Sequence, residues 1–274
     1  MEKLIVNRHK DVVDYCKVKG ITIDQFNEPV EISDWVRDCK EMFKGCESFN
    51  QPIIIPDGVE DCSFMFSNCK SFNQPITLPA GVENCSFMFS NCKSFNQPII
   101  LPDNITNCTG MFENCYAFDH PIVIPESVTD CHYMFSDCSS FNHPVAILGH
   151  CVMYGMFRGC LSFNQHIILP NGTKSCDLLF KDCTSFNQPV VIPESVRSCT
   201  CMFEGCELFN QPITFPDSVE DCSCMFKGCT SFNQPIKLPE HIKSYRNMFS
   251  GCMSLNSITI PIEVIKRIDV DYLF

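Results

Sequence analysis

The chain has 274 residues, a formal net charge of −12 and 22 cysteines, and 45% of its residues are hydrophobic. This composition predicts a folded protein, neither disordered nor membrane-spanning, because the apolar stretches are far shorter than the ~20 residues that cross a bilayer. The negative charge repels phosphate backbones and anionic lipids, so we expect no nucleic-acid partner and no membrane insertion.

The N-terminal residues 1–25 depart from the pattern that follows them. The opening stretch MEKLIVNRHKDVV lacks both an apolar run of roughly 7–15 residues and a small-residue cleavage site, so it predicts no secretion signal. That favours a cytoplasmic or virion-associated protein, with the cell surface as the alternative. We expect residues 1–25 to form a cap and one degenerate coil, because solenoids need polar caps at their ends.

Residues 26–261 form a repeat array. One Phe, taken as position 1 of the repeat, recurs every 23 residues, with a single interval of 22, at Phe43, Phe66, Phe89, Phe112, Phe135, Phe157, Phe180, Phe203, Phe226 and Phe249. A unit this short buries its apolar face only by stacking on its neighbours, so identical side chains form columns. The sequence therefore predicts a single solenoid domain over residues 1–274, closed by a C-terminal cap at 262–274.

Each unit contains two structural signals. Position 3 is always Gly, Asn or Asp, which tolerate a left-handed backbone, and the residue before the Cys at position 20 is mostly Asp, Asn or Ser, which cap a turn. The intervening CxxMF stretch predicts a short helical or 3₁₀ turn, and FNQPIxIP predicts a short strand between prolines. We therefore expect an α/β repeat solenoid with one short parallel strand and one short turn per coil, and a hydrogen-bonded ladder of Asn side chains at position 8.

The repeat resembles known families. The last copy, MFSGCMSLNSITIPIEVI, resembles the BspA-like leucine-rich repeat, and inner copies such as MFSNCKSFNQPITLP are similar to MFxxCxxFNQP-type surface-protein repeats. The FNQPI and IPxSV portions also resemble the FNIP repeats of amoebae and giant viruses. The resemblance implies a right-handed leucine-rich-repeat coil that acts as a binding or surface module.

Most cysteines fall in two columns, at positions 4 and 20. A buried ladder of free thiols, a set of disulfides between stacked coils and a zinc site are the three interpretations, and the thiol ladder is favoured because CxxxxxxC is not a zinc-knuckle spacing. Cys201 and Cys224 share the additional position 22 in adjacent coils. They are our candidates for a bridge or for reactive thiols.

No enzyme signature occurs, neither GxSxG, a phosphate-binding GxxxxGK, HExxH nor GxGxxG. We therefore expect no enzyme, no catalytic residues, no cofactor and no metal. The region 115–170 breaks the repeat and gathers aromatic and histidine side chains at Tyr116, His120, His132, Tyr133, His143, His150, Tyr154 and His166. Neutral drift, a partner-binding surface and a metal or pH-sensing role all fit this region.

A column at position 12 is unusually apolar for a face that the strand pattern turns outward. Its members are Ile54, Thr77, Ile100, Val123, Ala146, Ile168, Val191, Thr214 and Lys237. We refer to these nine residues as the apolar strip. If it is exposed, it predicts protein binding, with unidentified protein partners or self-association. The expected function is an interaction or structural scaffold, intracellular or virion-associated, and the alternative is a BspA-like surface adhesin.

Overall fold

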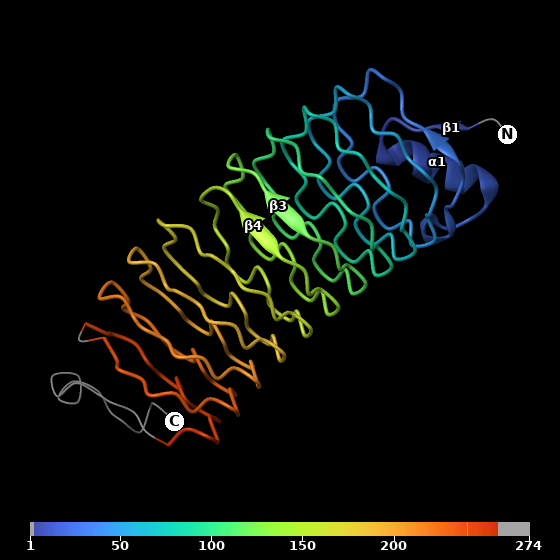
Figure 1. Ribbon diagram of the computed structural model, residues 1–274. Helices are drawn as coiled ribbons and strands as arrows, with labels where there is room; N and C mark the ends of the chain where they lie inside the picture. Colours follow the sequence, from blue (N-terminus) through green and yellow to red (C-terminus); the bar gives the residue numbers. More distant parts are fainter. Residues whose placement is uncertain (1–2, 240, 257–274) are drawn as a thin grey trace.

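The structure is a computed structural model that describes residues 3–239 and 241–256. The coils stack into one elongated solenoid, with helix α1 at its N-terminal end (Figure 1). This confirms the repeat solenoid of about 23 residues per coil. The predicted C-terminal cap at 262–274 lies outside the described residues.

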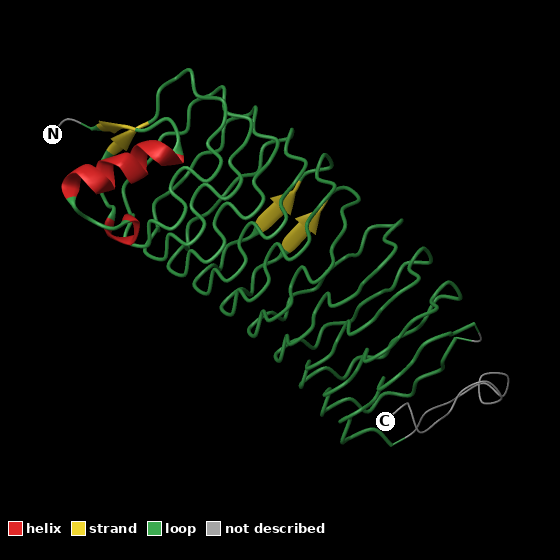
Figure 2. Cartoon of the chain, turned by 180° about the vertical axis from the view of Figure 1, so that it is seen from behind, coloured by secondary structure: helices red, strands yellow, loops and turns green. Residues whose placement is uncertain are grey.

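Regular secondary structure is sparse in this chain. The elements are β1 (Leu4–Ile5), α1 (His9–Lys19), the 3₁₀ helix η1 (Ile23–Gln25), β2 (Val30–Glu31), β3 (Ile122–Ile124) and β4 (Val145–Ile147). Strand β1 pairs in parallel with β2, and β3 pairs in parallel with β4. Turns and extended segments make up the other described coils (Figure 2).

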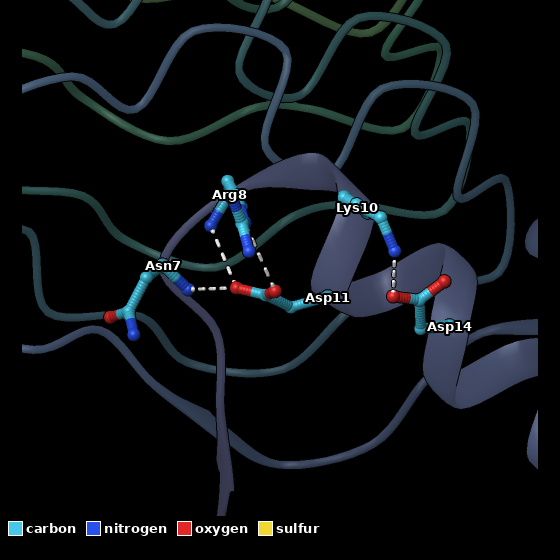
Figure 3. Close-up of polar contacts among 5 residues, drawn as sticks. All are labelled: Asn7, Arg8, Lys10, Asp11 and Asp14. Atoms are coloured by element: carbon cyan, nitrogen blue, oxygen red, sulfur yellow. Dashed lines mark hydrogen bonds and ion pairs between the residues drawn. The ribbon is translucent and has the colours of Figure 1, made fainter.

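The start of α1 is fixed by Asp11. Its carboxylate accepts the backbone N–H groups of Asn7 at 2.9 Å and Arg8 at 3.2 Å (Figure 3). These are donors that have no intrahelical acceptor, and an acidic side chain is also favourable in the first turn of a helix. One turn later Lys10 pairs with Asp14. The helix ends at Gly20, whose φ of 66° is the left-handed conformation of a helix stop.

Helix α1 lies against the first ring of the core. It buries Val12 and Cys16, and the Tyr15 ring meets the Phe26 ring edge-on at 5.8 Å. Phe26 in turn stacks on Phe49 of the next coil. The helix therefore covers the N-terminal end of the phenylalanine column that begins at Phe26 and continues through the coils.

Two columns of phenylalanine rings run through the core. The position-1 and position-7 rings of one coil lie 4.1–4.6 Å apart, and position-1 rings of neighbouring coils lie 5.6–5.8 Å apart. The separations between coils exceed the strand spacing of about 4.8 Å, because nearly parallel rings stack with an offset. The rings are buried, so they form two continuous columns of apolar contact between the coils.

The turn at CxxMF differs in detail from a helix. Met42 N–H donates to Cys39 O at 3.1 Å, the spacing of a 3₁₀ turn, but Glu41 between them has a φ of 57°. A left-handed residue in that place makes a β-turn and prevents the helix from continuing. Position 22 has this conformation in every coil, whatever its residue type, and Phe64 is one example with a φ of 56°. The left-handed conformation predicted at position 3 is confirmed in all ten coils.

Alternate N–H groups of these turns join one coil to the next. Cys39 N–H donates to Asp61 O, and Phe43 N–H donates to Met65 O, both at 2.8 Å. A capping side chain can also accept an N–H group within its own turn, as Asp61 Oδ1 does from Ser63 N–H at 2.6 Å. The strongest coil-to-coil hydrogen bonding is therefore on the turn side of the solenoid.

The predicted asparagine ladder at position 8 is present. Asn187 Oδ1 accepts Asn210 N–H at 2.9 Å and Gln211 Nε2–H at 3.1 Å, and the same pattern recurs along the array. Asp119 is the one acidic member, and it still accepts Asn142 N–H at 2.8 Å. His143 takes the place of the usual Gln there, with Nε2 at 3.7 Å from Asp119 Oδ2. Asp119 and His143 therefore replace the usual Asn and Gln together, and their side chains contact each other.

The structure describes all 22 cysteines as free thiols. At position 4 the thiols from Cys69 onward donate to a buried Phe carbonyl of the preceding coil, for example Cys69 Sγ to Phe43 O at 3.0 Å and Cys92 Sγ to Phe66 O at 3.0 Å. Burial raises the pKa values of these thiols. Cysteine at this position is therefore a small apolar residue that also satisfies a buried carbonyl.

Candidate functional site

The apolar strip is exposed along its whole length. Seven of the nine strip residues sit between two buried neighbours, as Ile54 (83% exposed) does between Ile53 and Ile55. The alternation follows from the extended backbone, which turns successive side chains to opposite faces. The structure confirms the exposure of all nine strip residues.

Prolines bracket the strip and weaken its backbone pairing. Pro52 and Pro56 flank the first strip segment and carry no N–H group to share with a neighbouring coil. In the part of the chain that the structure describes, the N–H groups of residues 53–55, 76–78 and 99–101 donate no hydrogen bond to protein. Strands β3 and β4 are an exception, since they pair with each other in parallel. The face therefore combines exposed apolar side chains with unused backbone donors.

Shallow grooves run between neighbouring segments of this face. One, of about 810 Å³, lies between residues 75–80 and 98–104 and includes the strip residues Thr77 and Ile100. Another, of about 400 Å³, lies between β2 and residues 51–56 and includes Ile54. Apolar clefts with a few polar edges are where partner side chains insert.

The eight residues predicted in region 115–170 do not form one cluster. The Tyr133 and Tyr154 rings meet edge-on at 5.3 Å, and the His132 ring lies 5.9 Å from Tyr154. Within residues 3–239 and 241–256, no hydrogen bond, ion pair or ring contact joins the other five members to one another. Their partners are instead the following: Lys93 over the Tyr116 ring, Asn96 O for His120, Asp119 for His143 and Gly172 beside His150, while His166 is exposed.

Cys201 and Cys224 are half-buried free thiols in the structure. Burial, together with the nearby Glu204 carboxylate, raises the pKa of Cys201 to about 12. A thiol with so high a pKa is a poor nucleophile at neutral pH. Bridging or reactivity of Cys201 and Cys224 stays a prediction, and the raised pKa of Cys201 does not favour it.

A charged network that the sequence analysis did not identify links three coils on the turn side. Glu204, with 15% of its side chain exposed, pairs with Lys181 at 2.7 Å and Lys227 at 3.1 Å. Burial raises the pKa of Glu204, but the hydrogen bonds from Lys181, Cys201 and Lys227 outweigh it and the net pKa is lowered. Lys181, Glu204 and Lys227 alternate in charge at position 2 of three successive repeats, and this alternation in the sequence could have indicated the network.

Metal-binding clusters and membrane-spanning helices can be assessed for residues 3–239 and 241–256. In this part of the chain, no group of three or more His, Cys, Asp or Glu side chains is arranged to hold a metal ion. No helix there has the length and apolar character that crossing a bilayer demands.

The fold and the strip define a class of protein, the leucine-rich-repeat solenoid. A leucine-rich repeat protein from Bacteroides ovatus is similar over 86% of this chain and 65% of its own, with a TM-score of 0.64 and 23% identity. A leucine rich cell surface protein from Faecalibacterium prausnitzii is similar over 84% of this chain and 72% of its own, with a TM-score of 0.52 and 20% identity. The pneumococcal vaccine antigen PcpA is similar over 86% of this chain and 62% of its own, with a TM-score of 0.53 and 17% identity.

These likenesses show the shared fold, and this chain spans less than two thirds of the Bacteroides ovatus protein. The sequence also matches a family over four overlapping segments, residues 22–101, 79–166, 124–213 and 151–261. The chain therefore belongs to the family described as "Mycoplasma protein of unknown function, DUF285". No curated protein matches the sequence.

Proposed function

We propose that the chain is a non-enzymatic protein-interaction or structural scaffold that binds a protein partner through the apolar strip. The observation that carries this proposal is the strip itself, which runs over nine successive coils with every member exposed. Contiguous apolar surface on a folded protein is typical of an interface. The unused backbone N–H groups beside it give a partner polar contacts as well.

The charge next to the strip indicates the chemistry of the partner. Five coils place an exposed carboxylate directly after the second proline of the strip segment, at Asp57, Asp103, Glu126, Glu194 and Asp217. Two copies of this chain facing each other would bring these columns and two net charges of −12 together. The partner that fits is a different protein, with an apolar ridge edged by Lys and Arg.

We expect strip substitutions to weaken partner binding at least tenfold, which corresponds to about 1.4 kcal/mol. A photo-crosslinking residue at position 100 first identifies the bound protein in the native source. Calorimetry then compares its Kd for the wild-type chain with that for Ile100→Asp and Ile168→Asp. A charge on the strip would have to be desolvated at the interface, so both variants should bind weakly.

Val18→Asp is the matched control, because Val18 is 85% exposed on α1, away from the strip. It should bind like the wild type. Equal Kd values for strip and control variants would refute the proposal. So would a wild-type dimer, seen by sedimentation, that Ile100→Asp dissociates, since the second copy would then be the occupant.

The proposal also includes the domain organisation, the location of the protein and the role of region 115–170. We propose a single solenoid domain in which residues 1–25 cap the first coil, consistent with the contact of α1 on Phe26. An intracellular or virion-associated location is part of this proposal, and it rests on the expected resemblance of the FNQPI and IPxSV portions to FNIP repeats. Among the eight aromatic and histidine residues, we propose the ring cluster of His132, Tyr133 and Tyr154 as the part that contacts a partner.

A BspA-like surface adhesin is the second candidate, favoured by the fold likeness to the Faecalibacterium prausnitzii cell surface protein. The oxidation state of the cysteines separates the two. For the intracellular scaffold we expect at least 20 of the 22 thiols to be alkylated when native-source protein is unfolded without reductant and counted by mass spectrometry. Several thiols that label only after reduction would favour the adhesin.

A further inference from the structure

On the turn side, the row of hydrogen bonds that joins neighbouring coils is interrupted at one junction among the described residues. At position 20 the N–H group donates to the next coil, as Cys131 does to Val152 O at 2.9 Å and Cys176 does to Ser198 O at 2.9 Å. Between these two, Met153 N–H makes no such bond to Ser175 within the described residues. The parallel bridges at position 19 also skip this junction.

The short repeat explains the gap. This coil has 22 residues, and Val152 occupies the place where the other coils carry a capping Asp, Asn or Ser. A valine side chain has no oxygen to accept the N–H group two residues later, so the turn loses its cap. Val152 is also 51% exposed, which is unusual for a valine beside the core.

A cavity of about 200 Å³ occupies the gap. Residues 150–153 line it from the short coil and residues 172–175 line it from the next one. His150 packs against Gly172, with Nδ1 3.4 Å from the position that a Cβ would occupy there. The cavity gives Cys151 an 8% exposure, whereas the column thiols around it, such as Cys131, have none.

Cys151 belongs to a pair of thiols. The Cys131 thiol lies close enough to interact with it, and the parallel bridge between Asp130 and Val152 places the two coils side by side there. The Cys131 thiol as donor lowers the pKa of Cys151, although burial opposes this. The neighbouring Cys151 thiol and, after it, burial raise the pKa of Cys131. The pair is therefore asymmetric, and the member that faces the cavity ionises first.

We propose that Cys151 is a hydroperoxide-reactive thiol at this cavity and that Cys131 is its resolving thiol. The Cys151 thiolate attacks one oxygen of the peroxide, which breaks the O–O bond, forms a sulfenic acid and, with one proton, releases water. The Cys131 sulfur then attacks the Cys151 sulfur and a second water leaves. Overall, two thiols and one hydrogen peroxide give one disulfide and two waters.

Two other thiol pairs provide an internal comparison. The thiols of Cys62 and Cys85, and those of Cys176 and Cys199, also lie close enough to interact. In both pairs the first cysteine keeps its backbone bond to the next coil, Cys62 N–H to Asn84 O and Cys176 N–H to Ser198 O, and the four thiols have no exposed surface. Oxidation therefore depends on the gap and its cavity, since the pairing of thiols alone is common to all three sites.

The test treats the reduced full chain at pH 7 with equimolar hydrogen peroxide, alkylates it at timed intervals and quantifies disulfide-linked peptides. We expect the Cys131–Cys151 link to form at least tenfold faster than the Cys62–Cys85 and Cys176–Cys199 links. Equal rates at the three pairs, or first oxidation at Cys201 or Cys224, would overturn the proposal. This comparison uses the wild-type chain, so it needs no variant to fold.

Variants then assign the two roles. Cys131→Ser should leave a sulfenic acid on Cys151 that dimedone labels, whereas Cys151→Ser should abolish both this label and the disulfide. Cys176→Ser is the matched control and should oxidise at Cys151 like the wild type. Dimedone labelling at Cys131 in the Cys151→Ser variant would reverse the assignment and refute it.

Discussion

Phe112→Ala is expected to lower the free energy of unfolding by about 3–5 kcal/mol. Phe112 is fully buried, and its ring stacks at 4.2 Å on Phe118 of its own coil. It also stacks at 5.8 Å on Phe89 and at 5.6 Å on Phe135, so the substitution leaves a cavity shared by three coils. Urea denaturation followed by circular dichroism measures the change.

Ile100→Ala is the control for that experiment. This substitution also truncates an apolar side chain of the repeat array, but the Ile100 side chain is 87% exposed. We expect a change within about 0.5 kcal/mol, because no cavity forms. If the two variants lost similar stability, the phenylalanine columns would not be the main contact between coils.

The repeat pattern predicted the features that every coil must share. A residue type that recurs every 23 residues must satisfy the same contact with its neighbour above and below, so the pattern alone indicates columns. This is why the left-handed residues at position 3, such as Gly45 and Asn68, and the ladder members such as Asn187 were predictable. The exposure of the apolar strip followed from alternation next to buried residues.

Position 22 shows what the pattern does not contain. Its left-handed backbone is imposed by the neighbouring turns, and residues as different as Phe64, Tyr133 and Leu178 adopt it. Packing then decides which side chains fit, since a Cβ at Gly155 would lie 2.5 Å from the Tyr133 ring of the coil before. Contacts between different residue types in adjacent coils have no periodic signal.

The gap beside Cys151 was visible only in part. The 22-residue interval and the missing capping residue could be read from the sequence, and they indicated an irregular coil. The lost hydrogen bond of Met153 and the thiol pair could not, because a shortened coil can close its ladder in several ways. Only the packed structure shows that the shortened coil leaves a cavity next to Cys151.

The asparagine ladder supports the second large prediction. Asn187→Ala should lower the free energy of unfolding by about 1–3 kcal/mol, because it removes the acceptor of two hydrogen bonds at once. These come from Asn210 N–H and Gln211 Nε2–H of the next coil, and both donors are only partly exposed. Hydrogen exchange at the Asn210 amide should also become faster.

Asn187→Asp separates the loss of the acceptor from other effects of the substitution. A carboxylate keeps the acceptor oxygen and nearly the same volume, and the chain already uses Asp119 in the same ladder position to accept Asn142 N–H. We therefore expect Asn187→Asp to stay within about 1 kcal/mol of the wild type and to keep the Asn210 amide protected. If Asp were as harmful as Ala, the amide side chain and not the acceptor would be what the ladder requires, and Asp119 would have to depend on its neighbour His143.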